Sequence, residues 1–456
     1  MFPTTNVKAG EILLKEQPFV YVLSGKYRTE HCDHCFAKGQ LLKCSGCQYV
    51  HYCGKGCQRE SWSIHKMECD KLKRIIPRIV PDAIRLIAKI IHKINKGGEG
   101  VRSYYTRDRF RTFKDLMSHY SDLKLDHRRL EHFTTLCAIL FEFIQDTSLP
   151  NSAELIGIYG RMVINSFNIC DSELKSIGVG VYLGASVIDH SCKPNAVATF
   201  EGTTLFIRTL VDLKVVDWTK VFISYIDVLN TPQDRCNELE RQYYFLCRCT
   251  KCIEDKTNLN FMYGAACQRK SCDGCIDMYN YKEGFTCNKC HTVPEQSFVD
   301  EYKEVTDYSK DCIDKMKNVA CILNKAVKEL DYDLCKVCLK RQDKILHKLN
   351  TLHIKVLDLT FESSIDFCHW EEAKELGTEL LDGYLFYYDD LNPLLGLLYM
   401  KLAKICALLN EDLTAIDFLR KAFNILKITH GIQSKLFRNE IKPLMEQLSY
   451  GMTFNN

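Results

Sequence analysis

Seven cysteines and one histidine fall into four short pairs between residues 32 and 69. The pairs are Cys32 with Cys35, Cys44 with Cys47, Cys53 with Cys57, and His65 with Cys69. A structural zinc ion needs four thiolate or imidazole ligands in a tetrahedron, and a short pair supplies two of them from one turn. Eight ligands therefore predict two zinc sites. The set is complete without the neighbouring residues His31, His34 and His51, which we expect to lie at the surface or beside the ligands.

Two further groups of cysteines follow later in the chain. Cys247, Cys249 and Cys252 provide three closely spaced thiolates, so a closed zinc site there needs a fourth ligand from elsewhere. Cys287 and Cys290 can close another site with two of Cys267, Cys272 and Cys275, and His291 is a fallback ligand. Cys335 and Cys338 lie in an apparently helical segment without a matching pair, so we expect no metal there.

The cysteine content itself favours metal binding. The chain has 25 cysteines in 456 residues, and its start shows neither the basic flank nor the cleavage site of a signal peptide. No stretch has the roughly 20 apolar residues of a membrane-spanning helix. We therefore expect a cytoplasmic and nuclear protein, whose compartments keep thiols reduced and disfavour disulfides. A net charge of +3 predicts no membrane binding and no, or only weak, direct DNA binding.

The sequence predicts both helices and small strands as the elements that position these groups. Apolar residues at helical spacing predict helices over 82–95 and 130–144, and long helices over 349–359, 394–409 and 415–426. Short apolar stretches at 197–200, 204–208 and 221–224, with Gly202 in the first connection, predict small strands and turns. A chain of this length is expected to form two to four domains.

The order of these motifs resembles the SET-and-MYND (SMYD) protein-lysine methyltransferase family over nearly the whole chain. The cysteine pairs with Tyr52, Gln58 and Trp62 resemble a MYND finger. The later segments NSFNIC (165–170), DHSCKPN (189–195), ISY (223–225) and RQYYFLCRCTKC (241–252) resemble a SET core in the same order.

The resemblance implies an α+β fold, with a small-strand SET core, an inserted finger, a helical insert and a helical C-terminal domain like tetratricopeptide repeats. The expected boundaries are 1–31 (truncated first part of the split SET domain), 32–69 (finger), 70–160 (insert), 161–228 (SET core), 229–253 (post-SET zinc segment), 254–298 (zinc ribbon) and 299–456 (helical domain).

The family also implies how the zinc ligands are shared. In a MYND finger the pairs interleave, which gives one zinc to Cys32, Cys35, Cys53 and Cys57 and another to Cys44, Cys47, His65 and Cys69. Cys192 of DHSCKPN is the family's fourth ligand for Cys247, Cys249 and Cys252. Related members carry a similarly wide pair in the ribbon, so Cys267 and Cys272 are preferred there with Cys287 and Cys290.

The activity implied is transfer of a methyl group from S-adenosylmethionine to lysine side chains of histones or other proteins. By this resemblance Tyr225 orients the lysine amine, Tyr243 lines the lysine channel and serves catalysis, and Phe167 adds a channel wall. The expected cofactor contacts are His119, Asn165, Asp189, His190 and Phe245. We expect a monomer that also binds partner peptides through its finger or its C-terminal helices.

The sequence departs from the family pattern at two places. Met1 lies just before Val7–Leu14, where the family normally has an earlier strand and a basic, glycine-containing turn that hold the cofactor. This predicts a shortened isoform, an incomplete gene model or a cofactor pocket without one wall. Asp189 replaces the usual Asn, exchanging an amide for a carboxylate that only accepts hydrogen bonds. The alternative function is therefore a weakly active or inactive SET-MYND adaptor in transcriptional regulation.

Overall fold

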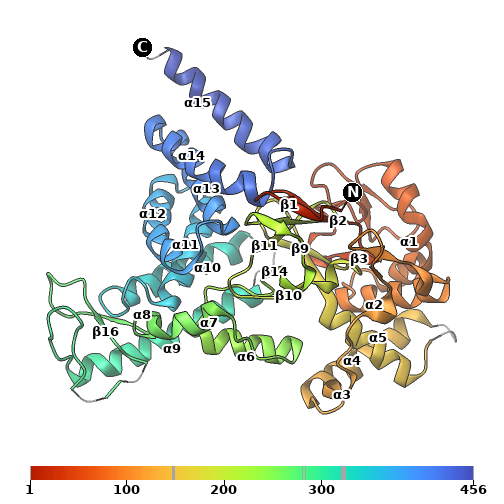
Figure 1. The fold of residues 1–456 in the computed structure, drawn as a ribbon, viewed down its shortest axis with the longest axis horizontal. Coiled ribbons are helices and arrows are strands. Elements are labelled where there is room, and N and C mark those ends of the chain that lie inside the picture. Colours follow the sequence, from red (N-terminus) through yellow and green to blue (C-terminus); the bar gives the residue numbers. More distant parts are fainter. Residues whose placement is uncertain (1, 146–148, 280, 283, 320–324, 455–456) are drawn as a thin grey trace. The chain divides into compact units, whose positions relative to one another are not determined.

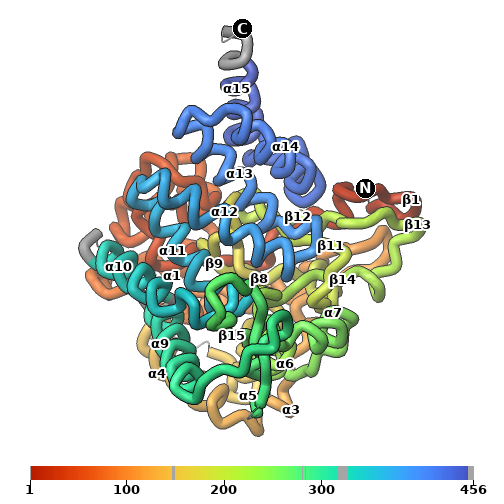
Figure 2. The backbone as a smooth tube through the Cα atoms, turned by 90° about the vertical axis from the view of Figure 1, so that its left-hand side faces the viewer, coloured from red at the N-terminus to blue at the C-terminus, as the bar shows by residue number. Residues whose placement is uncertain are grey.

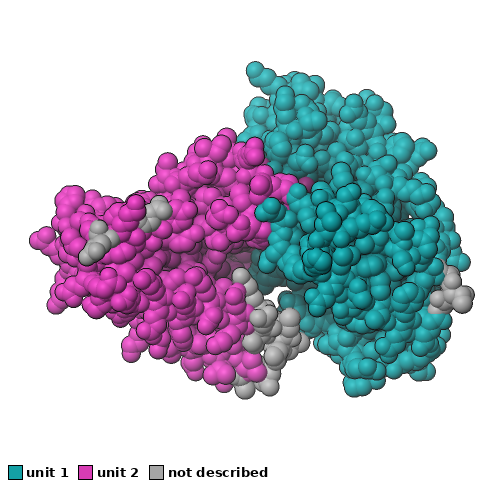
Figure 3. Space-filling model, turned by 90° about the horizontal axis from the view of Figure 1, so that it is seen from below, with its two compact units in different colours: residues 1–190, 194–223, 240–244 teal, residues 191–193, 224–239, 245–456 magenta. Residues whose placement is uncertain are grey.

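The computed structural model describes residues 2–145, 149–279, 281–282, 284–319 and 325–454. These residues form two compact units, which are coloured separately in Figure 3. Unit 1 contains residues 1–190, 194–223 and 240–244, and unit 2 contains residues 191–193, 224–239 and 245–456. Each unit therefore combines segments that are far apart in the sequence.

Two small antiparallel sheets form the centre of unit 1. Their strand orders are β11-β12-β2 and β3-β9-β8. The strands are β2 (Ile12–Glu16), β3 (Val20–Leu23), β8 (Ser166–Cys170), β9 (Ser176–Val181), β11 (Ala196–Glu201) and β12 (Thr204–Thr209). Burial alternates along β12, where Leu205 and Ile207 are fully buried, because successive side chains of a strand point to opposite faces.

The turn between β11 and β12 needs a glycine for two reasons. Gly202 has a φ of +63°, a conformation that residues with a Cβ rarely adopt. A Cβ at this position would also lie 2.7 Å from the carbonyl oxygen of Cys35. The turn predicted at Gly202 is thus confirmed, and it lies against a loop of the cysteine-rich segment.

Four shorter strand pairs complete unit 1. They are β1 (Thr5–Val7) with β13 (Leu213–Val215), β4 (Leu42–Lys43) with β5 (His51–Tyr52), β6 (Ser103–Tyr104) with β7 (Phe110–Arg111), and β10 (Asp189–His190) with β14 (Phe222–Ile223). The last pair is parallel, with Asp189 opposite Phe222 and His190 opposite Ile223. It places the start of the DHSCKPN segment beside the start of the ISY segment.

The described part of unit 1 also contains five α-helices. They are α1 (Lys55–Ile75), α2 (Asp82–Asn95), α3 (Tyr120–Leu123), α4 (His127–Ile144) and α5 (Ser152–Asn165). The helix predicted over 82–95 has the bounds of α2. The helix predicted over 130–144 begins three residues earlier, because the Asp126 side chain accepts a hydrogen bond from the Arg129 N–H and caps the first turn.

Unit 2 is predominantly helical, and its helices α9 to α15 are the teal-to-blue ones in Figures 1 and 2. Within it α9 to α14 pack in succession, each on its neighbour. Its elements are α6 (Pro232–Tyr243, whose last residues belong to unit 1), α7 (Thr250–Glu254), α8 (Leu259–Met262), β15 (Ala265–Ala266), β16 (Cys275–Ile276), α9 (Gln296–Val319), α10 (Lys325–Gln342), α11 (Thr351–Asp366), α12 (Trp370–Tyr387), α13 (Pro393–Leu408), α14 (Asp412–Thr429) and α15 (Lys442–Phe454).

The helix α13 lies between α12 and α14, and its sequence explains this position. Its residues are apolar on nearly all sides, and an α-helix of this kind is stable only when neighbours cover it. The α+β class expected from the sequence is confirmed by short sheets at the start of the chain and long helices at its end. Among the described residues no helix is both long and apolar enough to cross a membrane.

Candidate functional sites

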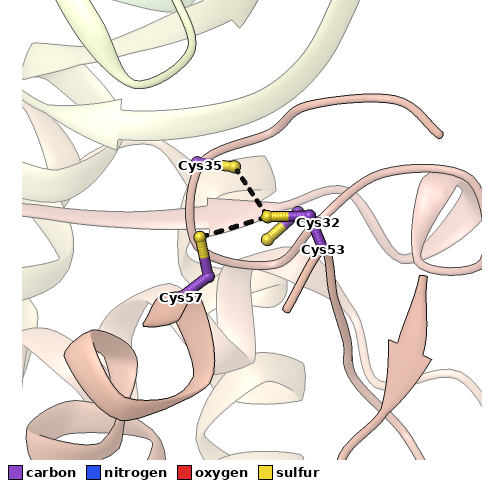
Figure 4. A group of neighbouring side chains, drawn as sticks. All are labelled: Cys32, Cys35, Cys53 and Cys57. Atoms are coloured by element: carbon purple, nitrogen blue, oxygen red, sulfur yellow. Dashed lines mark hydrogen bonds between the residues drawn. The ribbon is translucent and has the colours of Figure 1, made fainter. Parts of the chain in front are cut away.

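The first group of thiols lies in the finger segment of unit 1 (Figure 4). Cys53 follows β5, and Cys57 lies in the first turn of α1. The Cys53 sulfur is 3.7 Å from the Cys35 sulfur and 3.2 Å from the Cys57 sulfur. The side chains point toward one another and form no disulfide. The structure thus brings together Cys32, Cys35, Cys53 and Cys57.

The second group uses the helical spacing of α1. His65 and Cys69 are four residues apart on this helix and therefore share a face. The His65 Nε2 atom is 3.5 Å from the Cys44 sulfur and 3.6 Å from the Cys47 sulfur. All four side chains, Cys44, Cys47, His65 and Cys69, are buried. The two groups interleave along the chain, as the resemblance implied.

A buried arginine that the sequence did not single out links these two groups. Arg85 of α2 donates hydrogen bonds to both carboxylate oxygens of Asp33 and of Glu68. Asp33 follows Cys32, and Glu68 contacts the Nδ1 atom of His65 at 3.3 Å. Burial alone would raise the pKa of Glu68, but the charges of Arg85 and Lys89 hold that pKa well below its ordinary value. A carboxylate on the outer nitrogen of a ligand histidine fixes the orientation of its ring.

The third group lies in unit 2 and includes the residue that the resemblance supplied. The Cys192 sulfur is 3.9 Å from the Cys247 sulfur and 3.5 Å from the Cys252 sulfur. With Cys249, which precedes α7, they form a compact set of four thiols.

A second unforeseen arginine contacts this group. Arg235 of α6 is fully buried, and its Nη2 atom lies 3.6 Å from the Cys252 sulfur and 2.9 Å from an oxygen of Asp255. Its Nη1 atom donates to the carbonyls of Val228 and Asn230. A zinc ion with four thiolates carries a net negative charge, and a buried guanidinium beside it offsets part of that charge.

The structure of the fourth group shows which two of Cys267, Cys272 and Cys275 lie beside Cys287 and Cys290. The sulfurs of Cys267 and Cys290 are 3.4 Å apart, and those of Cys272 and Cys287 are 3.7 Å apart. Cys275 is on β16 and its thiol donates to the carbonyl of Asn260. The described cluster thus consists of Cys267, Cys272, Cys287 and Cys290, without Cys275 or His291.

The chemistry and spacing of all four groups fit zinc. Two thiolates bound to one tetrahedral zinc at about 2.3 Å lie roughly 3.8 Å apart, whereas disulfide sulfurs are about 2.05 Å apart. The closest sulfur pairs here are separated by 3.2 to 3.9 Å. In each group the four ligand atoms all lie within 4.8 Å of one another. None of the described groups contains His31, His34 or His51.

The residues expected at a methyl-transfer site are divided between the units. His119, Asn165, Phe167, Asp189, His190 and Tyr243 belong to unit 1, while Tyr225 and Phe245 belong to unit 2. The Asn165 amide at the end of α5 donates to the carbonyls of Met117 and Arg161. Its Nδ2 hydrogens are therefore engaged, and its Oδ1 is oriented as an acceptor.

Two aromatic contacts fix further residues of this set. His119 has a φ of +46°, donates a hydrogen bond of 2.9 Å from its Nδ1 atom to the Asp122 carboxylate, and lies with its ring centre 5.4 Å from that of Tyr244. Phe167 of β8 meets the ring of Tyr182 edge to face, with centres 5.6 Å apart. Asp189 is exposed at β10.

The backbone around Tyr243 is held by the start of α4. Arg128 donates to the carbonyl of Arg241, and Arg129 to that of Gln242. The Tyr244 hydroxyl donates to Asp126 at 3.0 Å. Burial alone would raise the pKa of Asp126, but hydrogen bonds from the Arg129 N–H and the Tyr244 hydroxyl lower it below its ordinary value. These contacts fix the backbone on both sides of Tyr243, from which its side chain extends.

The loop that carries Tyr225 is held within unit 2. The Ser224 hydroxyl donates to the carbonyl of Ile226, and Asp227 accepts hydrogen bonds from the Leu229 N–H and the Tyr388 hydroxyl. The Arg235 contacts to Val228 and Asn230 hold the same loop. Tyr225 therefore lies on a segment tied to the third cysteine group through one buried arginine.

Comparisons with known proteins agree with these features. A family profile described as MYND finger matches residues 32–69. The chain is 28% identical to histone-lysine N-methyltransferase ASHR1 of Arabidopsis thaliana, covering 98% of this chain and 92% of that protein. It is 28% identical to histone-lysine N-methyltransferase SMYD3 of Homo sapiens, covering 97% and 93%. It is 25% identical to N-lysine methyltransferase SMYD2-A of Danio rerio, covering 97% and 94%.

The matched finger, the four cysteine groups and the similarity along nearly the full length point to the same family. The relatives are named as lysine methyltransferases, and each match covers more than nine tenths of both chains. The chain is therefore similar, along nearly its full length, to methyltransferases of the SMYD group, and it contains a MYND finger.

Proposed function

We propose that the chain is a protein-lysine N-methyltransferase that uses S-adenosylmethionine. The observation that carries the proposal is the anchoring of the Tyr225 loop by Arg235, which also contacts the third cysteine group. A transferase of this kind works mainly by positioning, because the reacting amine, methyl carbon and sulfur must lie in a line. A loop whose backbone is held at the carbonyls of Val228 and Asn230 suits that task better than a mobile loop.

The residues of the chain would share the work as follows. The bound cofactor supplies an electrophilic methyl group. The Tyr225 hydroxyl oxygen accepts a hydrogen bond from the neutral lysine amine and directs its lone pair, while Tyr243 and Phe167 form apolar walls that exclude water. The amine must lose its ammonium proton to water before it enters, since only the neutral form is a nucleophile.

The donor set also fits a cationic cofactor. The exposed Asp189 carboxylate favours the sulfonium or ammonium charge, and the Asn165 Oδ1 accepts a hydrogen bond from an ammonium group. His119, His190 and Phe245 complete the proposed contacts. The four cysteine groups would each hold one zinc ion, which folds the surrounding loops and takes no part in the transfer.

The direct test is methyl transfer from labelled S-adenosylmethionine to histones and to other lysine-bearing proteins. Tyr225→Phe should reduce the rate by about a hundredfold, because the amine loses its orienting group. Tyr104→Phe removes an exposed hydroxyl and serves as the matched control. Equal rates in the wild type and Tyr225→Phe would overturn the assignment of Tyr225, and absence of transfer by the wild type would overturn the proposed reaction.

We propose a second role for the finger as a binding site for partner peptides. Leu42 and Trp62 of the finger segment expose 62% and 45% of their surface, which is unusual for large apolar side chains and typical of protein contacts. The adaptor alternative makes a distinct prediction. If it is correct, partner binding persists in Tyr225→Phe and is lost in Trp62→Ala, whereas methyl transfer is absent from the wild type.

A further inference from the structure

Unit 1 contains a cavity that the proposed reaction does not use. Its volume is about 610 Å³, which is in the usual range for small-ligand sites, and its walls come from α2, α4, α5, the strands β8 and β9, and the end of α6. All of its lining residues belong to unit 1. Its apolar part is formed by side chains such as Leu86, Met162 and Val179.

The polar side of this cavity is strongly cationic. Three guanidinium groups line it, those of Arg128, Arg129 and Arg241, against the single carboxylate of Asp82. Asp82 already accepts a hydrogen bond of 2.8 Å from the Gly25 N–H. None of the three arginines forms an ion pair with a carboxylate in the part of the chain that the structure describes. The lining itself thus has an excess of two positive charges, while Asp126, a carboxylate outside the lining, interacts electrostatically with Arg128 and Arg129.

Several of the arginine donors have no partner. The Nε atom of Arg129 is buried and has no hydrogen-bond partner among the described residues. The Arg241 side chain is exposed and makes no described contact. The Nε atoms of Arg161, Arg208 and Arg235 are unpaired as well, so what distinguishes this cavity is the gathering of three guanidinium groups at one lining.

The neighbouring histidine does not supply that acceptor or add a charge at neutral pH. His132 also lines the cavity, and one of its ring nitrogens is 2.7 Å from the Tyr159 hydroxyl. Burial lowers the pKa of His132, and the nearby Arg129 lowers it further. The ring is therefore neutral at pH 7, and the cationic character of the cavity comes from its arginines.

We propose that this cavity binds a phosphate monoester whose organic part is apolar, such as an aryl phosphate. A phosphate dianion balances the excess of two charges, and guanidinium groups bind phosphate oxygens with paired hydrogen bonds. The organic part would fill the region beside Leu86, Met162 and Val179. A free aryl phosphate and a phosphotyrosine side chain share this chemistry.

The proposal is tested by calorimetric titration of the full chain with phenyl phosphate, inorganic phosphate and phenol. Phenyl phosphate should bind more tightly than either fragment, because only it uses both halves of the cavity. Arg241→Gln should weaken its binding by about tenfold or more, since a charge-assisted hydrogen bond is lost. Arg107→Gln, an exposed arginine elsewhere in unit 1, is the matched control and should bind normally.

Two variants separate a loss of ligand binding from a loss of folding. Arg129→Gln should also weaken binding, but Arg129 supports the backbone at Gln242, so its melting temperature must be measured alongside. Arg241 has an exposed side chain, so Arg241→Gln is expected to fold. Equal binding of phenyl phosphate in the wild type and Arg241→Gln, or no preference over inorganic phosphate, would overturn the proposal.

A second comparison identifies the source of the ligand. A peptide with phosphotyrosine is titrated beside the same peptide with tyrosine. Tighter binding of the phosphorylated peptide, lost in Arg241→Gln, assigns the cavity to a protein side chain. Binding of phenyl phosphate without binding of the peptide assigns it to a free phosphate ester. These readouts are binding measurements and are independent of methyl transfer.

Discussion

At the scale of single residues, buried ion pairs connect segments that are distant in the sequence. Arg85 is 1% exposed and contacts two buried carboxylates, one beside each cysteine group of the finger. Such a triad gains little net stability when intact, because desolvation opposes the attraction. Removing the arginine alone is different, since it leaves the buried Asp33 without a cationic partner and leaves Glu68 with Lys89 as its remaining one.

We expect Arg85→Met to destabilise unit 1 by about 3–5 kcal/mol, the usual effect of breaking a buried ion pair. The variant should also lose zinc to a chelator faster, because Glu68 no longer has the partner that holds it against His65. Denaturant unfolding and the rate of zinc release measure these effects.

Arg420→Met, an exposed arginine without a described partner, is the control for this variant. Adding Asp33→Asn to Arg85→Met removes the buried carboxylate that has lost its cationic partner and should restore part of the stability. If Arg85→Met unfolds at the wild-type denaturant concentration, the triad does not organise the finger.

At the scale of helices, a carboxylate of α11, that of Asp358, accepts a hydrogen bond from the next helix. The Tyr384 hydroxyl of α12 donates to Asp358 at 3.0 Å. Burial raises the pKa of Asp358 to about 7, the charges of Glu362 and Asp227 raise it as well, and Lys401 opposes them. In the unfolded chain this carboxyl ionises near its ordinary value of 3.8.

The consequence is a loss of stability as pH rises. Between pH 4 and 7 the folded protein keeps a proton on Asp358 that the unfolded chain has released, so rising pH favours unfolding. Asp358→Asn cannot ionise and keeps an oxygen acceptor for Tyr384. Its melting temperature should exceed that of the wild type by a margin that grows from pH 5 to pH 8. Asp311→Asn, an exposed control on α9, should show no such trend, and a constant margin for Asp358→Asn would contradict the argument.

Close helix packing in unit 2 depends on a glycine of α12. A Cβ at Gly377 would lie 2.6 Å from a ring carbon of Phe361 and 2.9 Å from a methyl carbon of Leu402. Gly377→Val should therefore destabilise unit 2 by about 1–3 kcal/mol through overpacking, despite the better helix propensity of valine. Glu375→Val places the same side chain on the exposed face of the same helix, and its thermal unfolding should match the wild type. Wild-type stability of Gly377→Val would contradict the packing argument.

The elements also show what the sequence could and could not predict. Periodicity located α2, α13 and the β11–β12 hairpin, because each has its own apolar pattern and local turn or cap. The helix starting at His127 was placed late, since its cap residue is polar and lies outside the apolar pattern. Short cysteine pairs predicted the metal groups, while Arg85, Arg235 and the arginine-lined cavity depend on contacts between distant segments and carry no local signal.

At the scale of the whole molecule, the four cysteine groups divide evenly between the units. The two groups of the finger lie wholly in unit 1, and the groups of Cys192 and Cys267 lie wholly in unit 2. Zinc sites contribute folding free energy to the loops that supply their ligands. Because no group takes ligands from both units, loss of one zinc should affect its own unit and leave the zinc content of the other unchanged.

We therefore expect four zinc ions per chain, and three in either Cys57→Ser or Cys287→Ser, as measured by native mass spectrometry and elemental analysis. Cys368→Ser changes an exposed thiol outside the four groups and should retain four. Removal of zinc by a chelator should begin at the first finger group, whose Cys53 is exposed, and reach the fully buried group of Cys44 later. If Cys57→Ser also loses zinc from the groups of unit 2, the two units do not fold around their metals independently, and the division inferred from the ligand sets is wrong.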